Sequence, residues 1–200
     1  MRVKTETKRD AILKVASQVF QEMGYERASM DEIAARMGGS KVTLYGYFAS
    51  KQQLFLEVAN YTAVQHLGSA YDELVPGSDD LPRVLRRFGE KFVTFVCSPE
   101  VTGTYRMVMA QSDQSDIGRR FFELGPKRGE DTVAAFLQSE MDDGRLKRAD
   151  ASVVALHLMA LLSAETLQRI LLGVMVSPPR QQIKQMVDRA VKVFMAAYST

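Results

Sequence analysis

The sequence predicts an all-α protein of about nine helices, and three observations carry that prediction. Apolar residues recur at intervals of three and four, which is the period of an amphipathic helix. Helix-start signals precede these stretches, and no stretch shows the alternation of a strand bounded by hairpin turns. Apolar residues make up 46% and charged residues 25% of the 200 residues, which is an ordinary globular composition.

The first sixty residues are expected to form four helices. Gly24 ends the first helix, and Ser29–Glu32 has the form of a capping box that opens the second. A short third helix is expected over about 40–48, and a second capping box at Ser50–Gln53 opens a long fourth helix. The buried stripe of the first helix consists of Ile12, Val15, Ala16, Val19, Phe20 and Met23.

Further start and stop signals divide the rest of the chain. Ser98–Pro99 opens one helix, and Gly125–Pro126 must interrupt or kink another. Asp150 is expected to cap a single helix from Val153 to Leu172 that is apolar nearly all round. Ser177–Pro178 is expected to open the last helix.

Charge and cysteine content exclude several classes of protein. The single cysteine, Cys97, allows no internal disulfide, and no apolar run is long enough to span a membrane. The first ten residues are charged and no signal-peptide segment follows, so we expect a soluble cytoplasmic protein. Residues 1–51 carry nine Lys and Arg against six Asp and Glu, a basic bias that suits contact with a polyanion but equally fits a solvated tail.

The segment 29–55 has the outline of a helix-turn-helix, with two short helices joined by a glycine-containing turn. In such a motif the second helix enters the major groove of DNA. Lys41 can donate to guanine or phosphate, and the methyl groups of Val42 and Thr43 can contact thymine. Tyr45, Tyr47 and Lys51 are expected to contact the DNA backbone. The full set is Ser29, Ser40, Lys41, Val42, Thr43, Tyr45, Tyr47 and Lys51.

Other functions find less support in the residues. The only two histidines, His66 and His157, are far apart in sequence, so no zinc-binding spacing occurs. No glycine-rich phosphate loop is present either, and we expect neither an enzyme, nor a metal site, nor a cofactor. The alternative is a helical module that binds a small molecule or a protein without sequence-specific DNA contact.

The residues of the helix-turn-helix also resemble a known family. The segment 29–54 resembles the DNA-binding signature of the TetR family of transcriptional repressors through Ile33-Ala34, Gly38, Ser40, Thr43-Leu44-Tyr45, Phe48, Lys51 and Leu54. The segment from Tyr105 to Gly144 is similar to the AefR-like branch. The chain departs from the usual pattern at Gly39 and Gly46, and also at Met37 and Val42, which puts base specificity in question more than DNA binding.

The resemblance implies a DNA-binding domain over 1–50 and a ligand-binding and dimerisation domain over 51–200. It implies a homodimer on double-stranded DNA, most simply a repressor that a small molecule releases from a palindromic operator. Independently, an all-apolar helix over 153–172 needs cover that a second subunit could supply. The two recognition helices of such a dimer must lie about 34–36 Å apart.

A small apolar or amphipathic ligand is expected between the helices of the body, although an aromatic stripe of this kind is also typical of plain core. The expected ligand-binding residues are Phe88, Phe92, Tyr105, Arg106, Met109 and Phe121.

Overall fold

The computed structural model describes residues 5–78, 80–113 and 115–200, which form eleven α-helices. No strand occurs in these ranges; Leu146 and Ser199 form one isolated antiparallel bridge. No helix of the described residues is long and apolar enough to cross a membrane. The helices are α1 (Glu6–Arg27), α2 (Met30–Arg36), α3 (Lys41–Tyr47), α4 (Lys51–Tyr71), α5 (Leu81–Val96), α6 (Pro99–Ser112), α7 (Ile117–Leu124), α8 (Pro126–Asp142), α9 (Ala151–Ser163), α10 (Leu167–Leu171) and α11 (Arg180–Tyr198).

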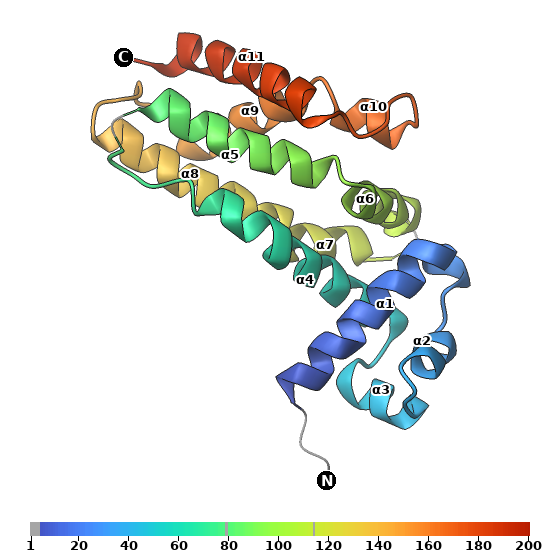
Figure 1. The fold of residues 1–200 in the computed structure, drawn as a ribbon. Helices are drawn as coiled ribbons and strands as arrows, with labels where there is room; N and C mark the ends of the chain where they lie inside the picture. Colours follow the sequence, from blue (N-terminus) through green and yellow to red (C-terminus); the bar gives the residue numbers. More distant parts are fainter. Residues whose placement is uncertain (1–4, 79, 114) are drawn as a thin grey trace.

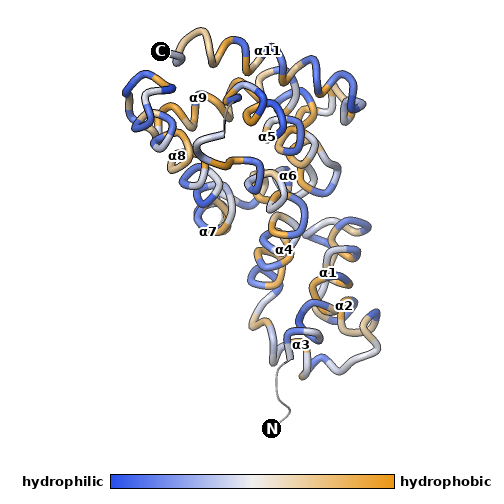
Figure 2. The backbone as a smooth tube through the Cα atoms, turned by 60° about the vertical axis from the view of Figure 1, so that its left-hand side comes forward, coloured by the Kyte–Doolittle hydropathy of each residue, from blue (hydrophilic) through white to orange (hydrophobic). Residues whose placement is uncertain are grey.

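The helices form two lobes that share α4 (Figures 1 and 2). Helices α1, α2 and α3 and the start of α4 enclose a core built around Ile12, Phe20, Leu44 and Phe55. The larger lobe stacks α4, α5, α8, α9 and α11 around a second core. Helices α6 and α7 lie where the lobes meet, and Val108 of α6 and Ile117 of α7 belong to the core of the smaller lobe.

Three of the predicted helix starts are confirmed by their hydrogen bonds. The Ser29 hydroxyl accepts from the backbone amide of Glu32 at 3.1 Å, and Ser50 accepts from Gln53 at the same distance. Asp150 accepts from the amide of Ser152 at 2.9 Å. Each bond satisfies one of the amides that a helix start leaves without an intrahelical partner.

The helix expected over 153–172 is in fact two helices. Helix α9 ends at Ser163, and α10 begins at Leu167. Between them Thr166 has non-helical dihedral angles (φ −128°, ψ −66°) and is fully buried, and its hydroxyl donates to the Ser163 carbonyl at 3.3 Å. A threonine side chain that bonds a nearby carbonyl competes with the helical ladder in this way.

The last helix also begins later than the sequence predicts. Ser177 and Pro178 lie in the connection before α11, which starts at Arg180. The Ser177 hydroxyl donates to the Cys97 carbonyl instead of capping the helix. Pro178 precedes a second proline, Pro179, which restricts the backbone of Pro178 to extended conformations. The helix therefore cannot begin at Pro178 and begins at Arg180 instead.

Helix α9 buries only one face within the subunit. Leu158 and Leu162 are buried in the larger core, whereas Val153 and Leu156 are 43% and 47% exposed. The hydropathy colouring of Figure 2 shows how few polar positions α9 has. The prediction that α9 is apolar around its circumference therefore holds for residues 151–163, and part of that surface is uncovered in the single chain.

Candidate nucleic-acid interface and ligand cavity

Helix α3 is held by one face and exposed on the other. Leu44 is fully buried in the smaller core, while Val42 is 82% and Tyr45 45% exposed. The Ser40 hydroxyl accepts from the Thr43 amide at 3.1 Å and lies 2.9 Å from the Thr43 hydroxyl. Figure 1 shows α3 at the end of the smaller lobe farthest from α11, where a second macromolecule can approach it. The exposed face offers a methyl-bearing side chain and a phenol to such a partner.

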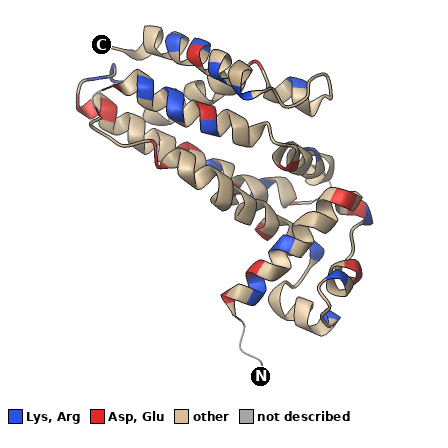
Figure 3. Ribbon diagram, in the orientation of Figure 1, with Lys and Arg blue, Asp and Glu red and all other residues tan. Residues whose placement is uncertain are grey.

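Lys41, at the first turn of α3, forms an ion pair with Asp31 of α2. The Lys41 Nζ lies 2.6 Å from the Asp31 Oδ1, and both side chains are more than half exposed. An exposed pair of this kind contributes little to stability, so the ammonium can exchange Asp31 for a phosphate at small cost. In Figure 3 both signs of charge are interspersed on α1 and α2.

Lys51, which the sequence predicts to contact a phosphate, forms hydrogen bonds within the smaller lobe. Its ammonium donates to the carbonyls of Tyr25 at 2.8 Å, Glu26 at 3.3 Å and Ala28 at 3.1 Å. It also lies 4.4 Å from the centroid of the Tyr25 ring. The three donors of the ammonium thus satisfy carbonyls at the C-terminal end of α1. Sequence reasoning missed this role because no local pattern links residue 51 to residues 25–28.

The other two expected DNA contacts are Tyr47, at the C-terminal end of α3, and Ser29, at the start of α2. The Tyr47 hydroxyl is half-buried and accepts from the Thr5 amide at 3.1 Å, which ties α3 to the start of α1. Ser29 is exposed at the N-cap of α2. The structure thus brings Ser40, Lys41, Val42, Thr43 and Tyr45 together on one short helix.

An apolar cavity of about 580 Å³ opens to the surface of the larger lobe and is lined by residues of α4 to α9 and by Leu167 of α10. Three of the expected ligand residues line it, namely Phe92, Tyr105 and Phe121. Its volume is in the range of small-molecule sites. Lining residues that sequence reasoning did not place in a pocket include Leu156 and Met159 of α9. The apolar pattern of α9 gave no signal that distinguishes cavity lining from interface.

The structure places the other three expected ligand residues elsewhere. Phe88 is fully buried in the larger core, stacked on Phe92 with ring centroids 5.6 Å apart. Arg106 donates through its Nε to the Leu171 carbonyl at 3.0 Å, which ties α6 to α10. Met109 is 56% exposed and does not line the cavity. Phe88 therefore belongs to the core, Arg106 joins α6 to α10, and Met109 lies on the surface, so the expectation that these three residues line the cavity is wrong.

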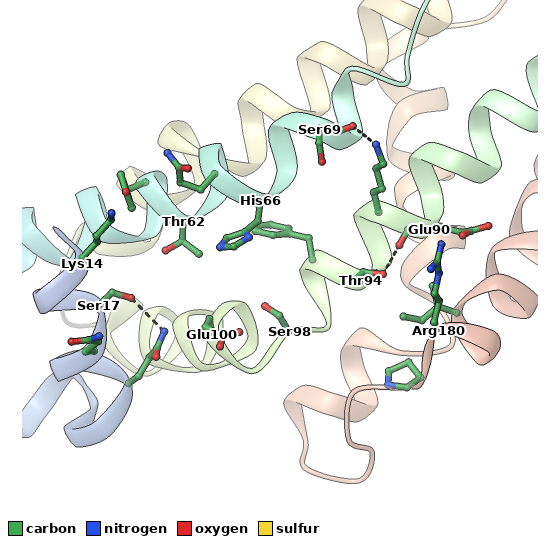
Figure 4. Close-up of a pocket in the computed structure, with 18 residues that line it drawn as sticks. Lys14, Ser17, Thr62, His66, Ser69, Glu90, Thr94, Ser98, Glu100 and Arg180 are labelled. Atoms are coloured by element: carbon green, nitrogen blue, oxygen red, sulfur yellow. Dashed lines mark hydrogen bonds between the residues drawn. The ribbon is translucent and has the colours of Figure 1, made fainter. Parts of the chain in front are cut away.

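A second, polar hollow of about 890 Å³ lies between α1, α4, α5 and the starts of α6 and α11 (Figure 4). Lys14 and His66 line it together with Glu90 and Arg180. Its walls carry charges of both signs. His66, for which the sequence gave no firm role, therefore lies beside this polar hollow and not in the apolar cavity.

Direct contacts join the two lobes near α6 and α7. The Tyr25 amide donates to the Met107 sulfur at 3.1 Å, and the Gln52 side chain donates to Asp116 at 3.1 Å. Gln111 of α6 also donates to Glu26 at the end of α1. Helices α6 and α7, which line part of the apolar cavity, thus also contact the smaller lobe, which contains the helix-turn-helix.

Two family models match this chain. The model described as "Bacterial regulatory proteins, tetR family" matches residues 12–58, which form α1 to α3 and the first part of α4. The model described as "AefR-like transcriptional repressor, C-terminal domain" matches residues 83–200, more than half of the chain. The chain belongs to the TetR family. It is a TetR-family transcriptional regulator with a DNA-binding helix-turn-helix.

Curated TetR-family relatives match parts of the chain. The HTH-type transcriptional activator FasR of Mycolicibacterium smegmatis is 38% identical over 95 residues, which cover 48% of this chain and 43% of FasR. The A-factor receptor protein of Streptomyces griseus is 32% identical over 132 residues, which cover 60% of this chain and 45% of the receptor. The matched region thus spans less than half the length of either relative. Both relatives are named as regulators or receptors, not as enzymes.

Solved structures extend the likeness to nearly the whole chain. A protein from Mesorhizobium loti MAFF303099 assigned to the TetR family has a TM-score of 0.89 at 24% identity, over 98% of this chain and 100% of that chain. The flavonoid-responsive regulator FrrA has a TM-score of 0.76 at 28% identity, over 98% of both chains. FadR of Bacillus subtilis, solved in complex with stearoyl-CoA, shares the fold with a TM-score of 0.73 at 13% identity, over 93% of this chain and 97% of that chain.

Proposed function

We propose that this TetR-family regulator is a homodimeric repressor that binds a palindromic operator and is released from it by a small molecule. The observation that carries the proposal is the exposed face of α3, with Val42 and Tyr45 open to solvent and Lys41 held only by an exposed ion pair. We assign DNA binding to residues 1–50 and ligand binding with dimerisation to residues 51–200.

Dimerisation is supported by the uncovered apolar surface of α9 and its neighbour α11. Val153 and Leu156 of α9 and Val193 of α11 are each about half exposed, and the two helices pack against each other. Pairing these helices with their symmetry mates buries that surface and relates the two copies of α3 by a two-fold axis. A two-fold dimer reads an inverted repeat, with half-sites about one helical turn apart.

Release by a ligand is supported by the position of the apolar cavity. Tyr105 and Phe121 line the cavity from α6 and α7, and both helices also contribute to the core of the helix-turn-helix lobe. A ligand that binds one spacing of the α3 pair better than another shifts the population toward that spacing. Coupling of 1–3 kcal/mol is typical of such systems and corresponds to about 5- to 150-fold in operator affinity.

Selection of bound duplexes from a random pool tests the DNA-binding part of the proposal. We expect an inverted repeat, and a reporter under that site should be silenced when the protein is present. A reporter that is switched on instead would show an activator, which is the activity named for FasR. Recovery of a single half-site without symmetry would contradict the dimeric arrangement.

A pair of matched variants tests the dimer. Leu156→Glu places a charge on the exposed face of α9 and should shift the protein to monomers in analytical ultracentrifugation. Val75→Glu places the same charge on a residue that is 55% exposed in the connection between α4 and α5, and should leave the dimer intact. A dimer that survives Leu156→Glu would contradict the use of α9.

A further inference from the structure

Two tyrosines from different helices line the apolar cavity. Tyr71 of α4 and Tyr105 of α6 both belong to its lining. Neither phenol oxygen forms a hydrogen bond with any of the described residues. Neither phenol oxygen is fully buried, so each is accessible to a molecule that enters the cavity and can donate a hydrogen bond to it.

Burial keeps both phenols in the neutral form, in which each can donate one hydrogen bond. Burial raises the pKa of Tyr71 to about 12, and the neighbouring Tyr105 acts in the same direction. Burial also raises the pKa of Tyr105, with a smaller contribution from the carboxylate of Glu130. Both phenols therefore remain hydrogen-bond donors at neutral pH.

Gly129 of α8 leaves the space that the Tyr71 hydroxyl occupies. A Cβ atom at residue 129 would lie 2.3 Å from the Tyr71 Oη, which is closer than any real contact. Gly129 is buried, and it is not in the left-handed region, so the close approach and not the backbone conformation requires glycine there. The hydroxyl of Tyr71 is therefore accommodated in a specific place at the wall of the cavity.

The charges that line the cavity disfavour an anion. Arg128 is the one Lys, Arg or His residue of the described lining, and its side chain is exposed at the start of α8. Glu130 is half-buried, and its charge already acts on Tyr105. A carboxylate placed at the phenols would be repelled by Glu130 and would lack a buried cation, which a desolvated anion requires.

Resting on the ligand role proposed above, we propose that the cavity binds a neutral, mostly apolar molecule whose carbonyl or ether oxygen accepts hydrogen bonds from Tyr71 and Tyr105. The apolar walls, which include Phe92 and Phe121, enclose the rest of the molecule. The two phenols determine which apolar molecules are selected, because a ligand without an acceptor leaves them unpaired.

Three probes of similar size and different polarity test this proposal on the full-length protein by isothermal titration calorimetry. Valerophenone carries a neutral carbonyl, pentylbenzene has no acceptor, and 5-phenylpentanoate is an anion at pH 7.5. We expect valerophenone to bind at least as tightly as pentylbenzene, although its carbonyl must be desolvated, and at least about tenfold more tightly than 5-phenylpentanoate.

Three variants complete the design. Tyr71→Phe and Tyr105→Phe should each weaken valerophenone binding about three- to tenfold and leave pentylbenzene binding unchanged or stronger. The control is Tyr61→Phe, which removes a phenol from α4 that lines the polar hollow and not the apolar cavity. It should change the binding of neither probe. Circular dichroism verifies that each variant is folded.

The outcomes separate this proposal from the proposed function. Preference for 5-phenylpentanoate, equal loss of valerophenone and pentylbenzene in the Phe variants, or no binding of any probe would each overturn the neutral-acceptor site. The comparison of probes on the unaltered protein decides the matter even if a variant does not fold. If valerophenone binds through the phenols but operator affinity does not change, the site stands and ligand release fails.

Discussion

Replacement of Lys51 by methionine distinguishes a structural lysine from a DNA-contacting one. Lys51→Met keeps the aliphatic stem but removes the ammonium that donates to the carbonyls of Tyr25, Glu26 and Ala28. These carbonyls lie at the end of α1 and lose their partner in the variant. Hydrogen bonds to charged groups contribute about 1.5–3 kcal/mol, and because Lys51 is half-buried we expect a total loss of about 2 kcal/mol.

The expected loss is large enough to measure. For a chain of this size, about 2 kcal/mol lowers the melting temperature by about 4–8 °C. Thermal unfolding followed by circular dichroism should show this shift for Lys51→Met. The matched control is Lys14→Met, which removes an exposed α1 ammonium that forms no hydrogen bond or ion pair with the described residues. That control should unfold at the temperature of the unaltered protein.

The dependence of operator affinity on salt supplies the second readout. Each phosphate that a cation neutralises contributes about 0.9 to the slope of log affinity against log salt concentration. Lys51→Met should leave that slope unchanged, whereas Lys41→Met should lower it by about one for each subunit if Lys41 exchanges Asp31 for a phosphate. An unchanged melting temperature together with a reduced slope in Lys51→Met would refute the structural role and restore the phosphate contact.

Three further predictions concern the recognition helix and acid stability. Thr43→Ala should cost about 1–3 kcal/mol of affinity at particular base pairs of the selected operator; an equal loss on scrambled duplexes would show that Thr43 does not read bases. Gly46→Ala should stabilise α3 by about 0.5–1 kcal/mol, because no atom lies within 4 Å of the added Cβ; hydrogen exchange over 41–47 should slow. Glu73 accepts from Lys91 at 2.6 Å, which holds the pKa of Glu73 below its usual value. Its stabilisation is present above a pH of about 4.3 and is lost as the pH falls through its folded pKa, so in denaturant titrations Glu73→Gln should be less stable at pH 7 and lose less stability in acid.

Local signals in the sequence predicted the elements of this fold well wherever one short segment decides the structure. Ser29, Ser50 and Asp150 each cap the helix that the sequence assigns to them. A capping hydrogen bond closes within three residues, so its donor and acceptor are visible together in the sequence. The break after Ser163 was missed because it depends on the burial of Thr166, which only the packed structure reveals.

The candidate sites show the same contrast between features that one short segment determines and features that depend on packing between distant segments. The residues of α3 were identified from one continuous segment, and the structure presents them on one helix. The cavity draws on seven helices, α4 to α10, so single apolar positions could not separate Phe92, which lines it, from Phe88, which lies one turn away in the core. The sequence could not show that Arg106, an expected ligand-binding residue, instead donates to the carbonyls of Ile170 and Leu171, because these lie more than sixty residues away.

The two sites are linked through single turns of α6 and α7. Tyr105 lines the cavity, and Val108, three residues later on α6, is buried in the core of the helix-turn-helix lobe. On α7, Phe121 lines the cavity and Ile117, four residues earlier, belongs to that same core. Protein interiors are close-packed and transmit small displacements, so α6 or α7 cannot shift around a ligand without moving an anchor of the lobe that carries α3. The coupling that the proposed function requires would therefore run through these two helices, which contribute to both the cavity and the core of the smaller lobe. Variants at Val108 or Ile117, which do not line the cavity, should then alter the effect of a ligand on operator affinity while leaving the cavity intact.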